Sequence, residues 1–306
     1  MDLFSEKLDL KDIKLFIDNI IIEFIGKENN TTIKEILEHS LIGGKRIRPI
    51  ITFLIFQNFP GLDIKKVSKI LIIPELIHNI SLIIDDLPCM DNDNFRRDKE
   101  TTHYKYGILP SYITIVKMIN NILYNFKNEI DINKKFSYKQ KNGVIKHLFI
   151  RDFIYDNLVS NMEDLIDGQY YDLTFINLDI DLEILYKINS KKTSPLFILS
   201  FILGYLGVIV INNNFIIEET ILDELKELGE IFGFIFQLND DILDREVDSL
   251  EGKNLNIAIH LGHNKAIEEF NNKCLLFQTK MENLKLWNKN FKEIIDLLKN
   301  RIIINN

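Results

Sequence analysis

Residues 75–97 read ELIHNISLIIDDLPCMDNDNFRR, an apolar run that passes directly into a cluster of acids. Four aspartates fall within nine positions, namely Asp85, Asp86, Asp91 and Asp93. Carboxylates this close repel one another, and a divalent cation would offset the repulsion. Oxygen ligands without His or Cys suit Mg²⁺, which binds one or two carboxylates and completes its shell with water and substrate phosphate. The stretch therefore predicts a cation site at the end of an apolar segment, with a solvated acidic turn as the alternative.

The proline at position 88 decides whether these aspartates can act together. On an unbroken helix, at ~100° per residue, Asp85 and Asp91 would not share a face. Proline disfavours the helical conformation of the residue before it and breaks the helix. The chain can then curl and bring Asp91 back toward Asp85. The segment forms a cup for a cation only if Pro88 bends it in this way.

A second acidic segment lies far downstream, where residues 237–244 read QLNDDILD. Asp240 and Asp244 are four positions apart and project from one face of a helix. An apolar run, residues 231–236, precedes them, as in the first segment. Two acidic clusters at the ends of apolar helices can face each other across the interior of a bundle. Solvated surface turns explain such a pair less well than they explain either cluster alone.

Basic residues accompany the acidic clusters in a chain whose net charge is −8. They lie in residues 43–49 (GGKRIRP), in the pair Arg96-Arg97 and in the pair Lys191-Lys192. Arginine makes bidentate contacts with phosphate, and lysine acts as a point charge. A diphosphate bridged by Mg²⁺ accounts for acids and bases together. Ordinary surface salt bridges are the alternative for each basic segment alone.

Helical spacing dominates the 306 residues, which include only 13 Gly and 6 Pro and so suggest long helices with few tight turns. We predict a nearly all-α chain that forms one domain over residues 1–306. A Lys-rich stretch, residues 127–143, is expected to be a long loop, and its Asn142-Gly143 pair is not expected to join two strands. Further breaks are expected at residues 212–214 and 248–256.

Composition excludes several classes of protein. A net charge of −8 and a pI of about 5.4 argue against nucleic-acid binding. Two cysteines cannot form a disulfide framework, and the acidic start MDLFSEKLDLKD resembles neither a secretory signal nor a transit peptide, so we expect a cytoplasmic protein. Residues 196–211 are apolar but shorter than the ~20 residues of a membrane span, which predicts a buried central helix and no transmembrane segment.

The chain resembles the trans-prenyl diphosphate synthases of the polyprenyl synthetase family. Five stretches carry the resemblance in the family's order: GGKRIRP (43–49), ELIHNISLIIDDLPCMDNDNFRR (75–97), DGQYYDL (167–173), KKTSPLF (191–197) and FQLNDDILD (236–244). The resemblance implies an all-α helical bundle of the isoprenoid-synthase type around a deep central cavity. It also implies a homodimer.

The resemblance assigns roles to residues of this chain. Three Mg²⁺ ions and the allylic diphosphate would be held by Asp85, Asp86, Asp91, Asp240, Asp241 and Asp244. Isopentenyl diphosphate would be bound by Lys45, Arg48, His78 and Arg97, with its tail near Phe236. Arg96 and Lys192 would grip the allylic diphosphate, and Thr193 and Gln237 would steady the developing allylic cation. Lys253 is a further candidate for the allylic site.

The implied reaction agrees with the chemistry of these residues. Diphosphate leaves only if its charge is neutralised, which Mg²⁺, Lys and Arg provide. The allylic cation must be shielded from water, and apolar cavity walls would do this. Ile80 stands where family members that make the C15 product often carry an aromatic ring. Because Ile is smaller, geranylgeranyl diphosphate (C20) is favoured as the product, and farnesyl diphosphate (C15) is second.

The match departs from the family pattern at several positions. Asp98 replaces a glycine after the Arg pair, Ser194-Pro195 replace Gly-Ala, and residues 252–254 shorten the segment after the second acidic cluster. Two alternatives stay open: a noncatalytic subunit of a heteromeric synthase, and a terpene cyclase with the same scaffold. Both acidic clusters are retained, which argues against the first. A cyclase needs no second diphosphate site, so residues 43–49 and His78 argue against it.

Overall fold

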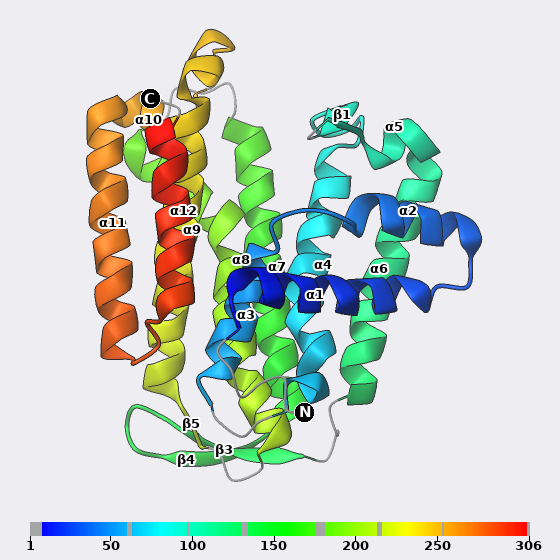
Figure 1. The fold of residues 1–306 in the computed structure, drawn as a ribbon, viewed down its shortest axis with the longest axis vertical. Helices are drawn as coiled ribbons and strands as arrows, with labels where there is room; N and C mark the ends of the chain where they lie inside the picture. The colour runs from blue at the N-terminus through cyan, green and yellow to red at the C-terminus, as the bar shows by residue number, and fades with distance from the viewer. Residues whose placement is uncertain are drawn as a thin grey trace. The chain divides into compact units, whose positions relative to one another are not determined.

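The computed structural model describes residues 8–59, 63–96, 98–129, 134–175, 181–212, 216–252 and 254–304. Helices account for 77% of these described residues, in agreement with the predicted all-α class (Figure 1). They are α1 (Leu10–Gly26), α2 (Thr31–Leu41), α3 (Ile47–Gln57), α4 (Ser68–Asp85), α5 (Thr102–Tyr106), α6 (Ile108–Glu129), α7 (Ile150–Phe175), α8 (Leu182–Ile211), α9 (Glu219–Leu250), α10 (Ile257–Leu261), α11 (His263–Asn283) and α12 (Lys289–Ile304), with a short 3₁₀ helix at Ile64–Val67. The strands are β1 (Phe95–Arg96), β2 (Lys99–Glu100), β3 (Lys135–Lys139), β4 (Ile145–Phe149) and β5 (Ile216–Glu218).

Polar side chains set the first turn of several helices. Asp9 accepts a hydrogen bond from the Asp12 amide at 2.8 Å at the start of α1. Asn30 accepts one from the Ile33 amide at 3.0 Å at the start of α2. Each carboxylate or amide oxygen satisfies a backbone N–H that has no partner within its own helix. These caps fix where the helices begin.

The described residues divide into two compact units. The first unit holds α1 to α6 and the last turns of α8, residues 203–211. The second unit holds α7 from Asp152 onward, α8 up to Ile202, and α9 to α12. Helix α8 therefore contributes residues to both units.

Helix α4 is the central element of the first unit. It contacts α1, α3 and α6, and its apolar side chains are buried along most of its length. The last turns of α8 lie against α3, where a Cβ atom added to Gly204 would come within 2.6 Å of the Thr52 carbonyl oxygen. Such burial on several sides explains why the run before Asp85 is apolar without a polar stripe.

Aromatic rings fill the core of the second unit. Phe232 of α9 lies 5.0 Å from Phe197 of α8 and 5.3 Å from Phe277 of α11, measured between ring centroids. Phe201 stacks on Phe291 of α12 at 6.3 Å with an interplanar angle of 15°. These separations are typical of favourable aromatic pairs, so the cluster joins α8, α9, α11 and α12.

Three glycines let neighbouring helices approach α8 very closely. A Cβ atom at Gly229 of α9 would lie 2.4 Å from the Ile198 Cα, and one at Gly233 would lie 2.6 Å from the Ser194 Oγ. On the other side, a Cβ at Gly168 of α7 would lie 2.4 Å from the Lys191 carbonyl carbon. We call Gly168, Gly229 and Gly233 the glycine clamp. It fixes α8 over residues 191–198, the segment that contains Lys192 and Thr193.

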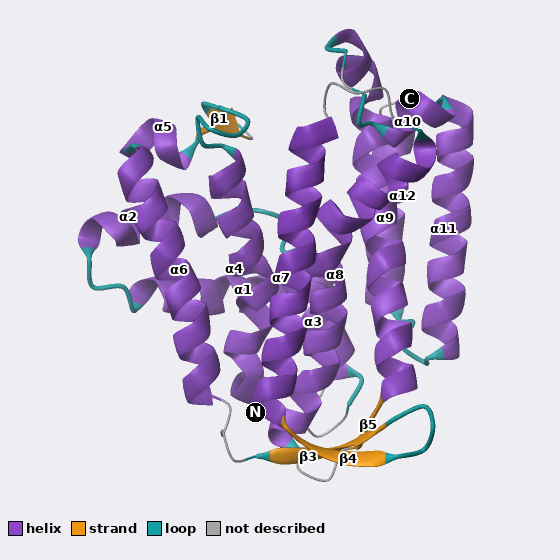
Figure 2. Ribbon diagram, turned by 180° about the vertical axis from the view of Figure 1, so that it is seen from behind, coloured by secondary structure: helices purple, strands orange, loops and turns teal. Residues whose placement is uncertain are grey.

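The Lys-rich stretch was wrongly predicted as a loop. Helix α6 continues to Glu129, and β3 and β4 form a hairpin. Strand β5 pairs with the other edge of β3, so the strand order is β4-β3-β5 (Figure 2). The Asn142-Gly143 pair lies in the turn of this hairpin, where Gly143 has a φ of 83° that favours glycine. Phe136 is buried and Tyr138 packs on Phe153. Their alternation with lysines is the strand signal that the high charge obscured.

Among the described residues, two helical segments are long and apolar enough to cross a membrane, judged by length and composition alone, namely Ile64–Asp85 and Leu182–Ile211. Their most apolar windows are 67% and 83% buried, respectively. A burial of this extent fits the predicted buried central helix over residues 196–211. Helix α8 ends at Ile211, and residues 213 and 214 of the break predicted at 212–214 lie outside the described residues. Helix α9 extends to Leu250, so the break predicted at 248–256 was placed too early.

Candidate active site

The first acidic cluster lies where α4 ends. The Asp91 amide donates to the Asp85 carbonyl at 2.9 Å, and the Asn92 amide donates to the Leu87 carbonyl at 3.1 Å. Asn92 takes a φ of 56°, so the chain reverses directly after Pro88. The predicted curl of Asp91 back toward Asp85 is therefore confirmed. Asp85 is half-buried and Asp91 is exposed.

Asp86 differs from its neighbours because its side chain is buried. It accepts a hydrogen bond from the Arg96 Nε at 2.6 Å. Burial raises the pKa of Asp86 above its ordinary value, and the Arg96 guanidinium offsets only part of that rise. Arg96 is held by the β1–β2 pairing, whose turn contains Asp98 at a φ of 61°. Arg97 lies outside the described residues.

Three cations in and beside the loop of residues 43–46, namely Lys45, Arg46 and Arg48, differ in burial although they look alike in the sequence. Gly43, Gly44 and Arg46 take φ values of 105°, 90° and 58°. Arg46 is only 3% exposed and donates to Asp18 of α1 and Glu75 of α4, at 2.8 Å each, and to the Leu41 carbonyl. Lys45 is exposed and Arg48 is half-buried. Arg46 thus anchors the loop that carries Lys45 and leads into the first turn of α3, where Arg48 lies. Its anchoring role could not be predicted from the sequence.

His78 and Ile80 lie on α4 before the acidic cluster. His78 is half-buried and precedes Asp85 by seven positions, which places the two residues on one helix face. Ile80 is buried at 6% exposure, on another face. Lys45, Arg48, His78, Ile80, Arg96 and the first three predicted metal ligands all belong to the first unit.

In the second unit, Lys192 of α8 forms an ion pair with Asp172 of α7. Lys191 pairs with two further carboxylates of α7, Asp164 at 3.0 Å and Asp167 at 2.9 Å. Residues 167–173 carry part of the family resemblance, but no role for them could be predicted from the sequence. The structure shows that this stretch of α7 supplies the counter-charges of both lysines.

A chain of hydrogen bonds links α8 to the second acidic cluster. The Thr193 Oγ donates to the Gln237 Oε1, and the Gln237 Nε2 donates to the Asp241 Oδ1, both at 2.8 Å. The Ile257 amide donates to the other oxygen of Asp241 at 2.8 Å. Burial raises the pKa of Asp241 to about 7, although the Gln237 and Ile257 hydrogen bonds lower it. Phe236 is half-buried and its ring lies 5.3 Å from that of Phe197.

The outer carboxylates of this cluster have a different environment. Asp240 accepts a hydrogen bond from the Arg301 Nη1 of α12 at 2.9 Å. Asp244, one turn further along α9, is exposed. Lys253 lies outside the described residues. Arg301 was missed by the sequence analysis because it lies far from Asp240 in sequence and within no recognised motif.

The donor set of the two clusters consists of carboxylates, which fits Mg²⁺. Within the described part of the chain, no three His, Cys, Asp or Glu side chains converge on a single metal position. In the first cluster Asp86 is tied to Arg96, and in the second Asp241 is tied to Gln237 and the Ile257 amide. The exposed or half-buried carboxylates, Asp85, Asp91, Asp240 and Asp244, are the ones a cation could reach.

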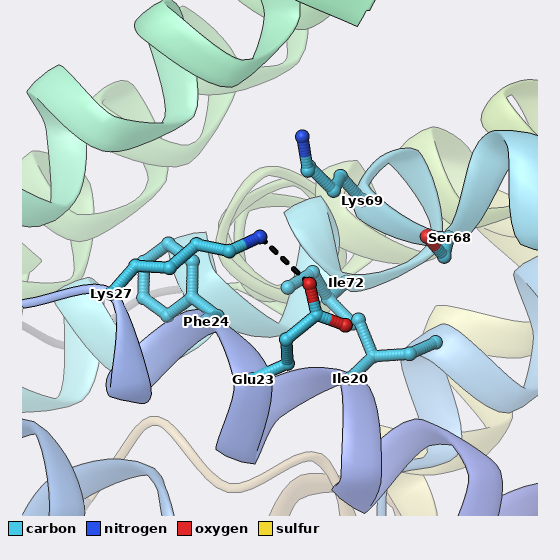
Figure 3. A pocket seen from close by; sticks show the side chains of 7 residues that line it. All are labelled: Ile20, Glu23, Phe24, Lys27, Ser68, Lys69 and Ile72. Atoms are coloured by element: carbon cyan, nitrogen blue, oxygen red, sulfur yellow. Dashed lines mark hydrogen bonds and ion pairs between the residues drawn. The ribbon is translucent and has the colours of Figure 1, made fainter.

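A small surface pocket in the first unit contains none of the predicted site residues. It lies between α1 and α4 and is lined by Ile20, Glu23, Phe24, Lys27, Ser68, Lys69 and Ile72 (Figure 3). The Lys27 ammonium forms an ion pair with Glu23 at 2.8 Å in its mouth. None of its lining residues therefore belongs to either acidic cluster.

Known proteins resemble this chain along most of its length. The family model described as polyprenyl synthetase matches residues 30–262. A farnesyl diphosphate synthase of Buchnera aphidicola is 34% identical over 219 residues, which cover 70% of each chain. A farnesyl diphosphate synthase of Bacillus subtilis is 28% identical over 80% of this chain and 71% of its own. Geranylgeranyl pyrophosphate synthase 4 of Arabidopsis thaliana is 30% identical over 69% of this chain, which spans about half (52%) of that relative.

Solved structures share the fold. A geranyltransferase from Legionella pneumophila superposes with a TM-score of 0.77 at 21% identity, over 97% of this chain and 96% of that one. A geranyltranstransferase from Thermotoga maritima gives a TM-score of 0.71 at 22% identity, over 96% and 98% of the two chains. The predicted all-α fold of the isoprenoid-synthase type is confirmed.

Proposed function

The chain belongs to the polyprenyl synthetase family, a family of prenyltransferases, and from that premise we propose that it is a Mg²⁺-dependent trans-prenyl diphosphate synthase. It condenses isopentenyl diphosphate with an allylic diphosphate to make a short-chain prenyl diphosphate. The observation that carries the proposal is the turn after α4, in which the Asp91 amide meets the Asp85 carbonyl and gathers the first acidic cluster.

Each side chain has a task in this reaction. Mg²⁺ bound by the outer carboxylates would neutralise the charge that develops on the departing diphosphate. Lys192, held by Asp172 in the second unit, and Arg96, held by Asp86 in the first, are the cations that each unit offers to a diphosphate. Because the Thr193 hydroxyl donates to Gln237, its lone pairs remain available to face the positive charge of the allylic group. Lys45, Arg48 and His78 hold isopentenyl diphosphate.

The assembly that we propose is a cytoplasmic homodimer. Helix α6 exposes large apolar side chains at three- and four-residue intervals, so that they share one face: Leu109, Tyr112, Ile113 and Val116. Leu109 and Val116 are 68% and 65% exposed. A contiguous apolar helix face of this kind supports an interface, and a second copy of the chain is the partner that we propose for it.

The activity is tested by incubating the purified protein with isopentenyl diphosphate, Mg²⁺ and each of the C5, C10 and C15 allylic diphosphates. Linear products that disappear with EDTA are expected. Lys45→Ala should lower kcat/KM for isopentenyl diphosphate about 10- to 100-fold, because it removes a charged contact with phosphate. Lys27→Ala, at an exposed lysine of the pocket between α1 and α4, is the control and should leave kcat/KM unchanged.

Other products would point to the alternatives. A cyclic hydrocarbon, formed equally well by Lys45→Ala, would identify a terpene cyclase. A lack of product from every primer would indicate a noncatalytic subunit of a heteromeric synthase.

For chain length we propose the C20 product. Ile80 is buried in α4, five positions before Asp85, and a larger ring there would shorten the space for the growing chain. Ile80→Phe should therefore shift the product distribution toward C15 or shorter, whereas Ile80→Leu, which keeps the volume, should not. The masses of the products measure this. A wild-type protein that makes only C15 would contradict the C20 proposal, and an unchanged distribution in Ile80→Phe would contradict the role of Ile80.

A further inference from the structure

The C-terminal helix is joined directly to the second acidic cluster. The Arg301 Nη1 donates to the Asp240 Oδ1 and to the Asn239 Oδ1, at 2.9 Å each. The Asn239 Nδ2 donates in turn to the Leu298 carbonyl at 2.8 Å. Helix α12 runs beside α9 along this contact (Figure 1). We call these three hydrogen bonds the α12 latch.

Burial divides the latch into a fixed part and an accessible part. Asn239 is completely buried, so its bond to Leu298 is a permanent part of the core. The side chains of Arg301 and Asp240 are each 35% exposed. Water and small ions can therefore reach the ion pair, while they cannot reach the Asn239 contact.

The second cluster has few carboxylates to offer a cation. Both oxygens of Asp241 accept hydrogen bonds, from Gln237 and from the Ile257 amide. Asp240 and Asp244 are the accessible members, and they are spaced to share a helix face. The Arg301 guanidinium on Asp240 neutralises one of these two negative charges and repels a divalent cation that approaches the cluster.

We propose that Arg301 and a divalent cation compete for Asp240. When a cation binds, the guanidinium leaves the carboxylate and the last turn of α12 loosens, while the Asn239 bond to the Leu298 carbonyl and the buried Ile302 side chain stay in place. When the cation leaves, Arg301 returns and neutralises the cluster. This inference rests on the proposed function in one respect, that the second cluster binds a cation. It makes the C-terminal helix a device that responds to occupancy of that cluster.

The competition is tested with Mn²⁺ alone, without substrates, by titrating the full-length protein and counting free Mn²⁺ by electron paramagnetic resonance. Arg301→Gln should bind Mn²⁺ about 2- to 5-fold more tightly than the wild type, the range expected for a partly exposed ion pair. Lys299→Gln is the matched control. It removes the same charge from the same helix, but the Lys299 charge lies near Cys274 of α11, whose pKa it lowers. The effect of Lys299→Gln on Mn²⁺ affinity should therefore be small.

A double-mutant cycle confines the effect to the pair. In an Asp240→Asn background, Arg301→Gln should no longer change the Mn²⁺ affinity. Equal affinities of the wild type and Arg301→Gln, or an effect that persists without Asp240, would overturn the competition.

Hydrogen exchange provides a readout that is independent of affinity. Saturating Mn²⁺ should speed exchange at the amides of residues 299–304 in the wild type, and Arg301→Gln should exchange quickly there without metal. Slower exchange on Mn²⁺ addition would overturn the proposal, since Arg301 would then support the cation. A wild-type protein and variants that bind no Mn²⁺ at all would instead refute the proposed Mg²⁺-dependent function, together with the inference that rests on it.

Discussion

Replacing Arg46 with methionine is expected to lower the free energy of unfolding by about 3–5 kcal/mol. The guanidinium is 3% exposed and donates to Asp18, to Glu75 and to a backbone carbonyl. Glu75 is itself only 5% exposed. Without Arg46 its carboxylate would stay buried without a counter-charge, which accounts for most of the cost. Urea unfolding of the wild type and the variant measures the difference.

Two further variants identify the cause of that loss. Adding Glu75→Gln to Arg46→Met should recover part of the lost stability, because it removes the uncompensated charge. Lys45→Met, at the exposed neighbour, should change stability by less than about 0.5 kcal/mol, since substitutions at exposed positions usually have small effects. An Arg46→Met protein as stable as the wild type would show that the loop is anchored by other contacts.

Gly229→Ala should be the second strongly destabilising change, costing about 2–3 kcal/mol. A Cβ at this position would lie 2.4 Å from the Ile198 Cα and 2.6 Å from the Ile198 nitrogen. Both atoms are backbone, so no side-chain rotation can relieve the clash, and α8 must move away from α9. Because Thr193 is in the clamped segment, its hydrogen bond to Gln237 should weaken and the turnover number should fall.

Gly26→Ala is the matched control for the glycine clamp. Gly26 is the last residue of α1, and nothing lies within 4 Å of a Cβ added there. Alanine should therefore keep or slightly raise stability through its better helix propensity. Thermal unfolding of both variants tests the difference. Equal melting temperatures for Gly229→Ala and Gly26→Ala would mean that α8 and α9 can separate without cost.

Features that depend on neighbouring residues could be predicted from the sequence. The apolar run that ends at Asp85, the bend at Pro88 and the return of Asp91 all follow from local backbone preferences. The helical spacing of Asp240 and Asp244 likewise follows from α9. The all-α class follows from the same periodicity, repeated along the chain.

Features that depend on distant residues could not be predicted. Arg46 looks like a third phosphate ligand until Asp18 and Glu75 are placed beside it, 28 and 29 positions away. The Arg301 contact joins residues 61 positions apart. The four-residue spacing of Gly229 and Gly233 can be seen in the sequence. The surface of α8 that these glycines contact cannot. The hairpin was predicted as a loop for a different reason. Its lysines concealed the alternation of Phe136 and Tyr138 with polar residues.

The pairing of β3 with β5 has a consequence for how the chain is made. Lys139 of β3 forms an ion pair with Glu218 of β5, although the two residues are 79 positions apart in the sequence. Helices α7 and α8 are made after β3 and before β5. At roughly 5–20 residues per second, a ribosome that has completed β3 needs roughly 4–16 seconds to deliver its partner strand. During that interval one edge of β3 has no strand to pair with. Lysines at both ends of β3, Lys135 and Lys139, are the residues that keep such an edge from recruiting other nascent chains.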